Sequence, residues 1–203
     1  MEGLTDTYKT LDGPSPEVLY KNKKSKFYGY AFPITDETEV KPIITSLRRK
    51  HPAANHVCYA WRLGVANSSY RANDDGEPKN SAGIPIYGQL QSFGVTNLIV
   101  AVARVFGGTK LGVNGLITSY RAAAQMALEA SHLVEKVLQT TFVLAFDYPL
   151  MDVVMRLIKQ HHLEVVSQRL ELGCELVVAV RKDHSQKIMG KFKMIYGVRI
   201  KEF

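Results

Sequence analysis

The sequence has few cysteines and no long apolar run, and these two features argue against a cysteine-based metal site, a disulfide framework and a membrane-spanning helix. Only two cysteines occur among 203 residues. Cys58 and Cys174 lie too far apart for a CxxC metal knuckle, and a disulfide framework is not expected. The longest apolar runs, 98–103 and 176–180, fall far short of the roughly 20 residues of a membrane-spanning helix. The first residues show neither a basic leader nor an apolar signal region, so we expect a cytoplasmic protein with no membrane partner.

Positive charge exceeds negative charge throughout the sequence. Lysine and arginine outnumber aspartate and glutamate by 26 to 19, which gives a net charge of +7 and a pI near 9.3. The excess is 16 minus 12 in residues 1–138 and 10 minus 7 in residues 139–203. A basic surface favours polyanionic partners, because each phosphate that a cation neutralises releases counterions. RNA is therefore a natural partner, while sequence-specific DNA binding is not expected.

The first two thirds of the chain alternate between strand and helix patterns. Period-two and period-3.6 apolar spacings distinguish the two kinds of element. They predict strands at 27–32, 56–63 and 97–106, helices at 35–50, 86–93 and 116–130, and one long loop at 66–85. Loops of this length inside a compact domain are uncommon and usually functional. The order is typical of the mixed α/β (α+β) class.

The pattern changes after Leu138. It predicts strands at 140–146, 164–171, 174–180 and 197–201, with helices at 149–161 and 183–192. This βαββαβ order is that of a ferredoxin-like split βαβ unit. We therefore expect two domains, residues 1–138 and residues 139–203.

A glycine-rich loop, Phe106–Gly115, follows the predicted strand at 97–106 and precedes a predicted helix. This arrangement aims backbone N–H groups and the positive end of a helix dipole at an anion. Lys110 adds a mobile charge, with Arg104 and Arg121 as possible flanking cations. The spacing fits neither the Walker A motif nor GxGxxG. Tight turning for close packing is the alternative explanation.

An acidic turn, Asp74–Pro78, lies at the centre of the long predicted loop. Its carboxylates are of the kind that magnesium prefers, although their spacing is not that of an EF-hand. The structural alternative is that Asp and Asn side chains hold the turn while Glu77 accepts backbone N–H bonds or meets Lys110 or Arg104. We favour this structural explanation over a magnesium site, and no metal or cofactor is expected.

Five segments together resemble the IMPACT family, also known as UPF0029. They are Lys24–Phe27, His51–Ala60, Asp74–Pro78, Ser81–Ile86, and Arg104–Leu116 with Tyr120. The resemblance implies a first domain of the ribosomal S5 domain 2-like fold and a ferredoxin-like second domain, similar to domains IV and V of elongation factor G. Eukaryotic members of the family regulate translation, so the resemblance suggests a role in that process, and it establishes no catalytic residue. The chain departs from the family at Asn114, where glycine is usual.

Three functional hypotheses follow. The leading one is a non-enzymatic protein that binds RNA or the ribosome, with cations contacting phosphate and Glu77 orienting the glycine loop. The second is an enzyme acting on a phosphate-bearing small molecule, with magnesium between the loops Asp74–Glu77 and Gly107–Gly115. The third is a protein-interaction module. The predicted binding residues are Arg71, Asp75, Glu77, Lys79, Arg104, Gly107, Gly108, Lys110 and Arg121.

Overall fold

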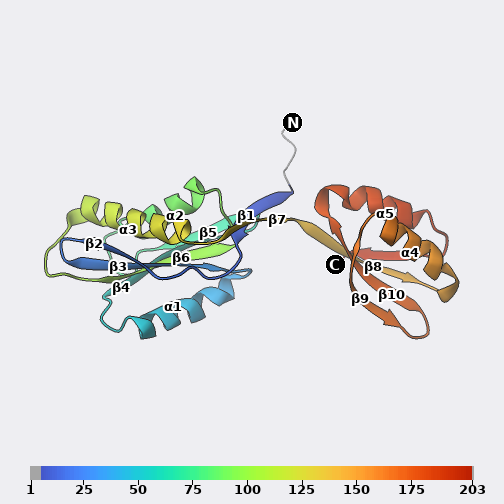
Figure 1. The fold of residues 1–203 in the computed structure, drawn as a ribbon, viewed down its shortest axis with the longest axis horizontal. Coiled ribbons are helices and arrows are strands. Elements are labelled where there is room, and N and C mark those ends of the chain that lie inside the picture. Colours follow the sequence, from blue (N-terminus) through green and yellow to red (C-terminus); the bar gives the residue numbers. More distant parts are fainter. Residues whose placement is uncertain (1–5, 203) are drawn as a thin grey trace. The chain divides into compact units, whose positions relative to one another are not determined.

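The computed structural model describes residues 6–202, which form two compact units (Figure 1). One unit comprises residues 8–136, and the other comprises the chain from residue 137 onward together with Asp6 and Thr7. Each unit has a hydrophobic core built from its own residues. The division falls close to Leu138, where the sequence pattern changes.

The first unit is built around a five-stranded antiparallel sheet with the order β2-β3-β6-β4-β5. The central strand β6 is apolar except for Arg104, and it is almost entirely buried because both of its faces are covered. The predicted loop at 66–85 is wrong, since it contains a strand. That strand, β5, lies at the sheet edge and is mostly exposed, so it carries little apolar alternation. The strands are β2 (Val18–Asn22), β3 (Ser25–Pro33), β4 (His56–Leu63), β5 (Ser69–Asn73) and β6 (Leu98–Val105).

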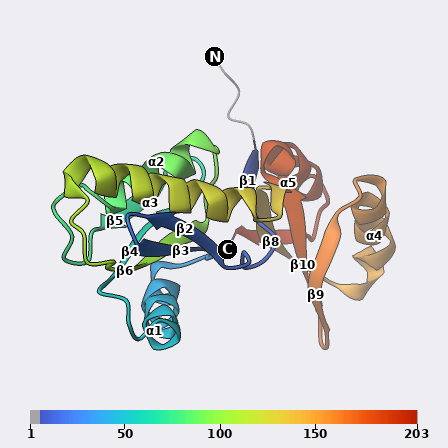
Figure 2. The same cartoon turned by 60° about the vertical axis from the view of Figure 1, so that its left-hand side comes forward.

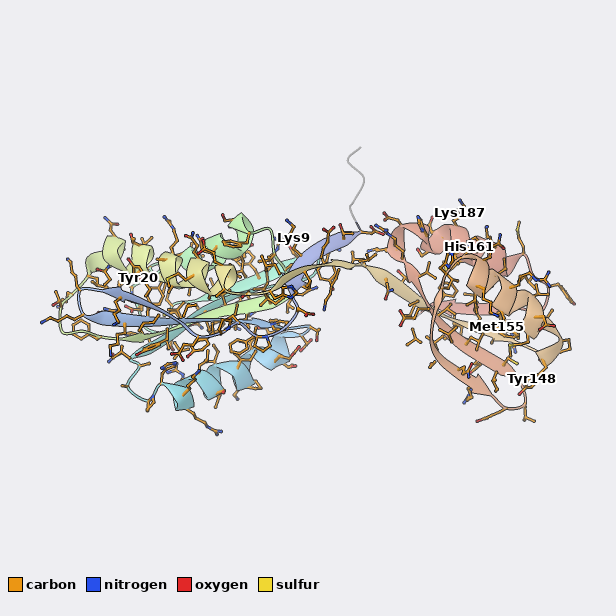
Figure 3. All side chains as sticks on the ribbon, viewed as in Figure 1. Lys9, Tyr20, Tyr148, Met155, His161 and Lys187 are labelled. Atoms are coloured by element: carbon orange, nitrogen blue, oxygen red, sulfur yellow. The ribbon has the colours of Figure 1, made fainter. Side chains whose placement is uncertain are left out.

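Helices cover both faces of this sheet (Figures 1 and 2). On one face lie α2 (Gly83–Ser92) and α3 (Gly112–Glu129), and on the other lie η1 (Glu37–Glu39) and α1 (Val40–Lys50). Helix α3 approaches β3 closely, since a Cβ added to Gly29 would lie 2.6 Å from the carbonyl oxygen of Ala123. Tyr20, labelled in Figure 3, packs against the core between α3 and the sheet. No helix within residues 6–202 is both long and apolar enough to cross a membrane.

Two helices begin earlier than the sequence predicts. Helix α2 begins at Gly83 rather than residue 86, and α3 begins at Gly112 rather than residue 116. Glycine and asparagine in the first turn of α3 are poor helix formers, so local propensity does not reveal this start. The structure also contains a two-stranded sheet that the sequence does not predict. Its strands, β1 (Thr7–Leu11) and β7 (Leu133–Val137), are far apart in the sequence, so no local pattern indicates their pairing.

The second unit has a four-stranded antiparallel sheet with the order β11-β8-β10-β9. Helices α4 and α5 contribute Val154, Ile158, Ile188 and Phe192 to the core on one face of it. The element order agrees with the predicted βαββαβ order. The elements are β8 (Gln139–Phe146), η2 (Tyr148–Leu150), α4 (Met151–Gln160), β9 (Glu164–Leu170), β10 (Cys174–Arg181), η3 (Lys182–His184), α5 (Ser185–Lys193) and β11 (Arg199–Glu202).

Candidate functional site

Three segments meet at one end of the five-stranded sheet, called here the loop end. The pairs Lys26–Val105 and His56–Arg104 place the start of β3, the end of β6 and the start of β4 beside one another. The loop end therefore carries the β2–β3 turn at residues 23–24, the acidic turn at 73–78 and the glycine loop at 106–111. The two loops singled out from the sequence are neighbours in the fold.

The two aspartates of the acidic turn are bound by protein donors. Asp74 accepts hydrogen bonds from the backbone N–H groups of Asn80, Ala82 and Gly83 at 2.8–3.0 Å. These bonds provide acceptors for N–H groups at the start of α2 that have no partner within the helix. Asp75 accepts two hydrogen bonds from one guanidinium nitrogen of Arg48, at 2.6 and 2.7 Å, and one from the N–H of Val57 at 2.6 Å.

Glu77 links the acidic turn to both sides of the glycine loop. Its Oε1 lies 2.5 Å from Nη1 of Arg104, which precedes the loop on β6. The same oxygen accepts a hydrogen bond of 2.8 Å from the hydroxyl of Tyr120, which follows the loop on α3. The expected meeting of Glu77 with Arg104 is confirmed. Because Glu77 and Arg104 are only 8% and 6% exposed, this pair is a buried structural element.

Arg104 is enclosed and does not face solvent. Its guanidinium carbon lies 5.6 Å from the ring centroids of both Phe27 and Phe106. Its Nε is buried and has no hydrogen-bond partner within residues 6–202. The prediction that Arg104 contacts phosphate is therefore not supported by its position, because burial and the bond to Glu77 keep the charge inside the protein.

Cys58 and Tyr120 extend this buried network. The Cys58 thiol donates to the carbonyl of Asp74 at 3.0 Å and lies 3.3 Å from the Tyr120 hydroxyl. Burial is the main cause that raises the pKa of both the Cys58 thiol and the Tyr120 phenol. A thiol held protonated is a poor nucleophile, so this cysteine packs rather than reacts.

The carboxylates of the acidic turn are engaged by donors of the protein itself. Across residues 6–202 no group of three histidine, cysteine or acidic side chains is placed to hold an ion. Asp74, Asp75 and Glu77 each accept from protein donors instead. The turn is therefore a structural clasp, which is the alternative that the sequence favoured.

The glycine loop combines close packing with free donors. A Cβ on Gly107 would overlap the backbone of Lys24 and Ser25, and the N–H of Gly107 donates to Ser25 Oγ at 3.1 Å. Gly108 has a φ of +84° and open space around it. No hydrogen bond from the N–H groups of residues 108–110 is recorded within the described part of the chain, and α3 has no side-chain cap. Asn114, where the family usually has glycine, lies inside the first turn of α3 and not in the loop at residues 106–111.

The contact through Gly107 brings the lysine-bearing β2–β3 turn against the glycine loop. Lys23 and Lys24 form the β2–β3 turn with positive φ angles, Lys26 follows on β3, and Lys110 lies in the glycine loop. All four are exposed, and none takes part in an ion pair recorded for residues 6–202. We call Lys23, Lys24, Lys26 and Lys110 the basic edge.

The remaining predicted cations lie elsewhere in the unit. Arg71 on β5 pairs with Glu37 at 3.2 Å on the α1 face. Since β5 and β2 are opposite edges of the sheet, the two strands are four interstrand spacings apart, roughly 19 Å, and Arg71 does not adjoin the β2–β3 turn. Lys79 precedes α2, and Arg121 lies on the exposed side of α3. The predicted binding residues therefore lie on three separate surfaces. Of these residues, only Lys110 belongs to the basic edge, and Gly107 and Gly108 support it.

Sequence reasoning left Lys23, Lys24 and Lys26 out of the predicted binding residues. The lysine cluster is visible in the sequence, but its position beside the glycine loop depends on the pairing of β3 with β6. The available signal was Gly107 itself, because a glycine in a polar loop often marks a close approach of two backbones.

A second titratable cluster lies between the sheet and α1. The Tyr30 hydroxyl donates to Glu17 and lies 2.6 Å from Nε2 of His51, so the histidine nitrogen is the donor in that contact. Tyr28 stacks on the His51 ring at 4.4 Å, and Lys50 lies 3.0 Å from Glu17. Burial lowers the pKa of His51, while the bond from Tyr30 lowers the pKa of Glu17.

Comparisons with known proteins converge on one family. The profile of the Impact N-terminal domain matches residues 23–128. A Haemophilus influenzae protein named "IMPACT family member" is 29% identical over 171 residues, which cover 82% of this chain and 83% of that protein. "IMPACT family member YigZ" of Escherichia coli is 33% identical over 133 residues, covering 64% of this chain and 65% of that protein. A crystal structure of "an hypothetical protein" superimposes with a TM-score of 0.73, 25% identity and coverage of 97% of both chains.

Proposed function

The chain belongs to the IMPACT family, and from this membership and the geometry of the loop end we propose that it is a non-enzymatic protein that binds RNA or the ribosome through the basic edge. The observation that carries the proposal is that the acidic side chains of the loop end have partners within the described part of the chain and its lysines do not. The acidic residues of the loop end are bound by the protein's own donors, whereas the four lysines are exposed and unpaired within the described residues.

Phosphate chemistry matches this surface. Lysine contributes a flexible point charge to phosphate contacts, and free backbone N–H groups at a helix start add further donors. Residues 108–110, in the loop just before the N-cap Leu111 of α3, have N–H groups with no hydrogen bond recorded within residues 6–202. Contacts of this kind position a nucleic acid without reading its bases, so we expect affinity for RNA backbone rather than for one sequence.

The fold supports a role in translation. We propose that the first unit has the S5 domain 2-like fold and that the second is ferredoxin-like, as the family resemblance implies. The sheet order β11-β8-β10-β9, with both helices on one face, agrees with the second assignment. Regulation of translation is the process we assign to the RNA or ribosome contact.

Co-sedimentation with ribosomes at low salt tests the proposal. Lys24→Glu and Lys110→Glu should each reduce the bound fraction, because a cation that faces phosphate becomes an anion. Lys41→Glu is the matched control, since Lys41 is an exposed lysine on α1 with no recorded ion pair within residues 6–202. Each substitution changes the net charge equally, from +7 to +5.

The control separates a local site from overall charge. Binding that falls for Lys24→Glu and Lys110→Glu but not for Lys41→Glu supports the basic edge. Equal losses in all three variants would assign binding to net charge alone, and absence of binding at low salt would refute the proposed function.

A further inference from the structure

Helices α2 and α3 enclose a groove that the proposed function does not use. The two helices lie side by side over the same face of the sheet (Figures 1 and 2). The groove has a volume of about 570 Å³ and is lined by Asn80, Ile84, Pro85, Gly88, Ile117 and Arg121, among others. Binding pockets commonly measure about 300–1,000 Å³, so the space is sufficient for several side chains of a ligand.

Gly88 accounts for part of the hollow. A Cβ added at Gly88 meets no atom within 4 Å, and its φ lies outside the positive region. A Cβ at this position therefore has open space around it, and a larger side chain there would extend into space that the groove now leaves empty. Glycine in a helix interior destabilises the helix by about 1 kcal/mol relative to alanine, and Gly88 lies in the interior of α2.

The lining is apolar along most of its length. Ile84 is 44% exposed on α2, and Ile117 lies on the facing side of α3. Val113, one turn before Ile117, is 51% exposed. Exposed aliphatic side chains on adjacent helices suit apolar side chains of a partner and offer nothing to a phosphate backbone.

The charge of the groove is of one sign. Arg121 is its only charged lining residue and has no ion pair recorded within residues 6–202, and Lys79 lies next to the lining residue Asn80. A second copy of this chain would bring another net charge of +7 to a cationic groove. A partner with carboxylates complements it.

We propose that this groove is a docking site for an acidic amphipathic helix of a partner protein. Ile117 and Arg121 are one turn apart on α3, so they pair with an apolar and an acidic side chain one turn apart on the ligand. The site is separate from the basic edge, so it can be present whether or not the basic edge binds RNA.

Chemical-shift mapping of the full ¹⁵N-labelled chain tests this proposal. The probe is a synthetic peptide of about four helical turns with leucine and glutamate one turn apart, compared with the same peptide carrying lysine in place of glutamate. We expect saturable shifts at residues 84, 88, 117 and 121 with the acidic peptide and none with the basic one. Arg121→Glu should weaken binding about tenfold or more.

Gly88→Leu should abolish the shifts by filling the groove. Gly190→Leu is the matched control, because Gly190 is also a helical glycine with no atom within 4 Å of an added Cβ, and it lies in the other unit. Arg121→Glu, on the helix surface, provides an independent variant if Gly88→Leu does not fold. No saturable shifts with the acidic peptide, or binding unchanged in Gly88→Leu, would overturn the proposal. Shifts produced at the groove by an RNA hairpin instead of the peptide would likewise refute it.

Discussion

At the scale of single residues, Glu77 is the acidic side chain that joins the acidic turn to both sides of the glycine loop. One of its oxygens accepts from both Arg104 and Tyr120, so one carboxylate fixes the strand before the glycine loop and the helix after it. A buried charge pair contributes little net stability compared with apolar residues, but breaking it leaves an uncompensated charge. Glu77 is therefore expected to be far more sensitive than its exposed neighbours.

Glu77→Gln should destabilise the first unit by about 3–5 kcal/mol, because Arg104 stays buried without a counter-charge. Urea unfolding followed by tryptophan fluorescence measures this effect, since the single tryptophan, Trp61, lies on β4 of the same unit. The double variant Glu77→Leu with Arg104→Met should lose less than Glu77→Gln. If Glu77→Gln is as stable as the wild type, the buried pair does not hold the loop end.

His51 makes stability depend on pH. Its pKa in the folded state is lowered by burial, whereas the unfolded value is about 6.5. Below that value the unfolded chain binds more protons than the folded chain, so stability falls as pH falls through this window and is restored as pH rises. Glu17, Tyr28, Tyr30 and Lys50 are the titratable groups around the ring.

His51→Gln should flatten the pH dependence of the first unit between about pH 7 and pH 5. The measurement is the urea midpoint reported by Trp61 at several pH values. His161→Gln is the contrast, because burial also lowers the pKa of His161, labelled in Figure 3, but this residue lies in the other unit. An unchanged pH slope in His51→Gln would contradict the assignment.

At the scale of elements, the β2–β3 turn and the glycine loop form one assembly. Gly107 lets the loop lie directly against Lys24 and Ser25, and Asn22 Nδ2 donates to Ser119 Oγ of α3 at 3.0 Å. The lysines of the turn are thus positioned by the loop that carries Lys110. A displacement of either element would move the lysines of the β2–β3 turn away from Lys110.

Gly107→Ala should cost about 1–3 kcal/mol or more, since the added methyl group overlaps backbone atoms that cannot move aside cheaply. It should also weaken RNA binding although no charge is lost. Gly13→Ala is the control, because an added Cβ at Gly13 meets nothing within 4 Å. Equal stability of the two variants, by thermal unfolding, would show that the close approach is not required.

The sequence predicts elements well where the apolar period is strong. Strand β4 begins and ends at the predicted residues, and α1 ends at residue 50 as predicted. Strand β5 was missed because an exposed edge strand has no buried face to impose alternation. The pairing of β1 with β7 is a contact between distant segments, which no local pattern reveals.

The candidate site was predicted in position more than in composition. The acidic turn and the glycine loop are neighbours, as expected, because Glu77 bridges them. Arg104 and Asp75 are among the predicted binding residues, but Arg104 is buried against Glu77, and Asp75 accepts from Arg48 and from the N–H of Val57. Spacing along the chain cannot show whether a charge faces inward, since that depends on which strands pair.

At the scale of the whole molecule, the net charge of +7 is shared by both units, so overall attraction to RNA is expected from either. The central claim is more specific, because it assigns phosphate contacts to the basic edge. Each phosphate contact adds about 0.7–0.9 to the slope of log affinity against log salt concentration. Counting lost contacts by this slope therefore distinguishes direct contact from general charge.

The most direct test is the salt dependence of binding to a structured RNA, measured by fluorescence anisotropy, for Lys24→Ala with Lys110→Ala and for the control Lys41→Ala. We predict that the double variant lowers the slope by roughly 1.4–1.8, which is two contacts, while the control leaves it unchanged. A double variant with the wild-type slope would contradict the account.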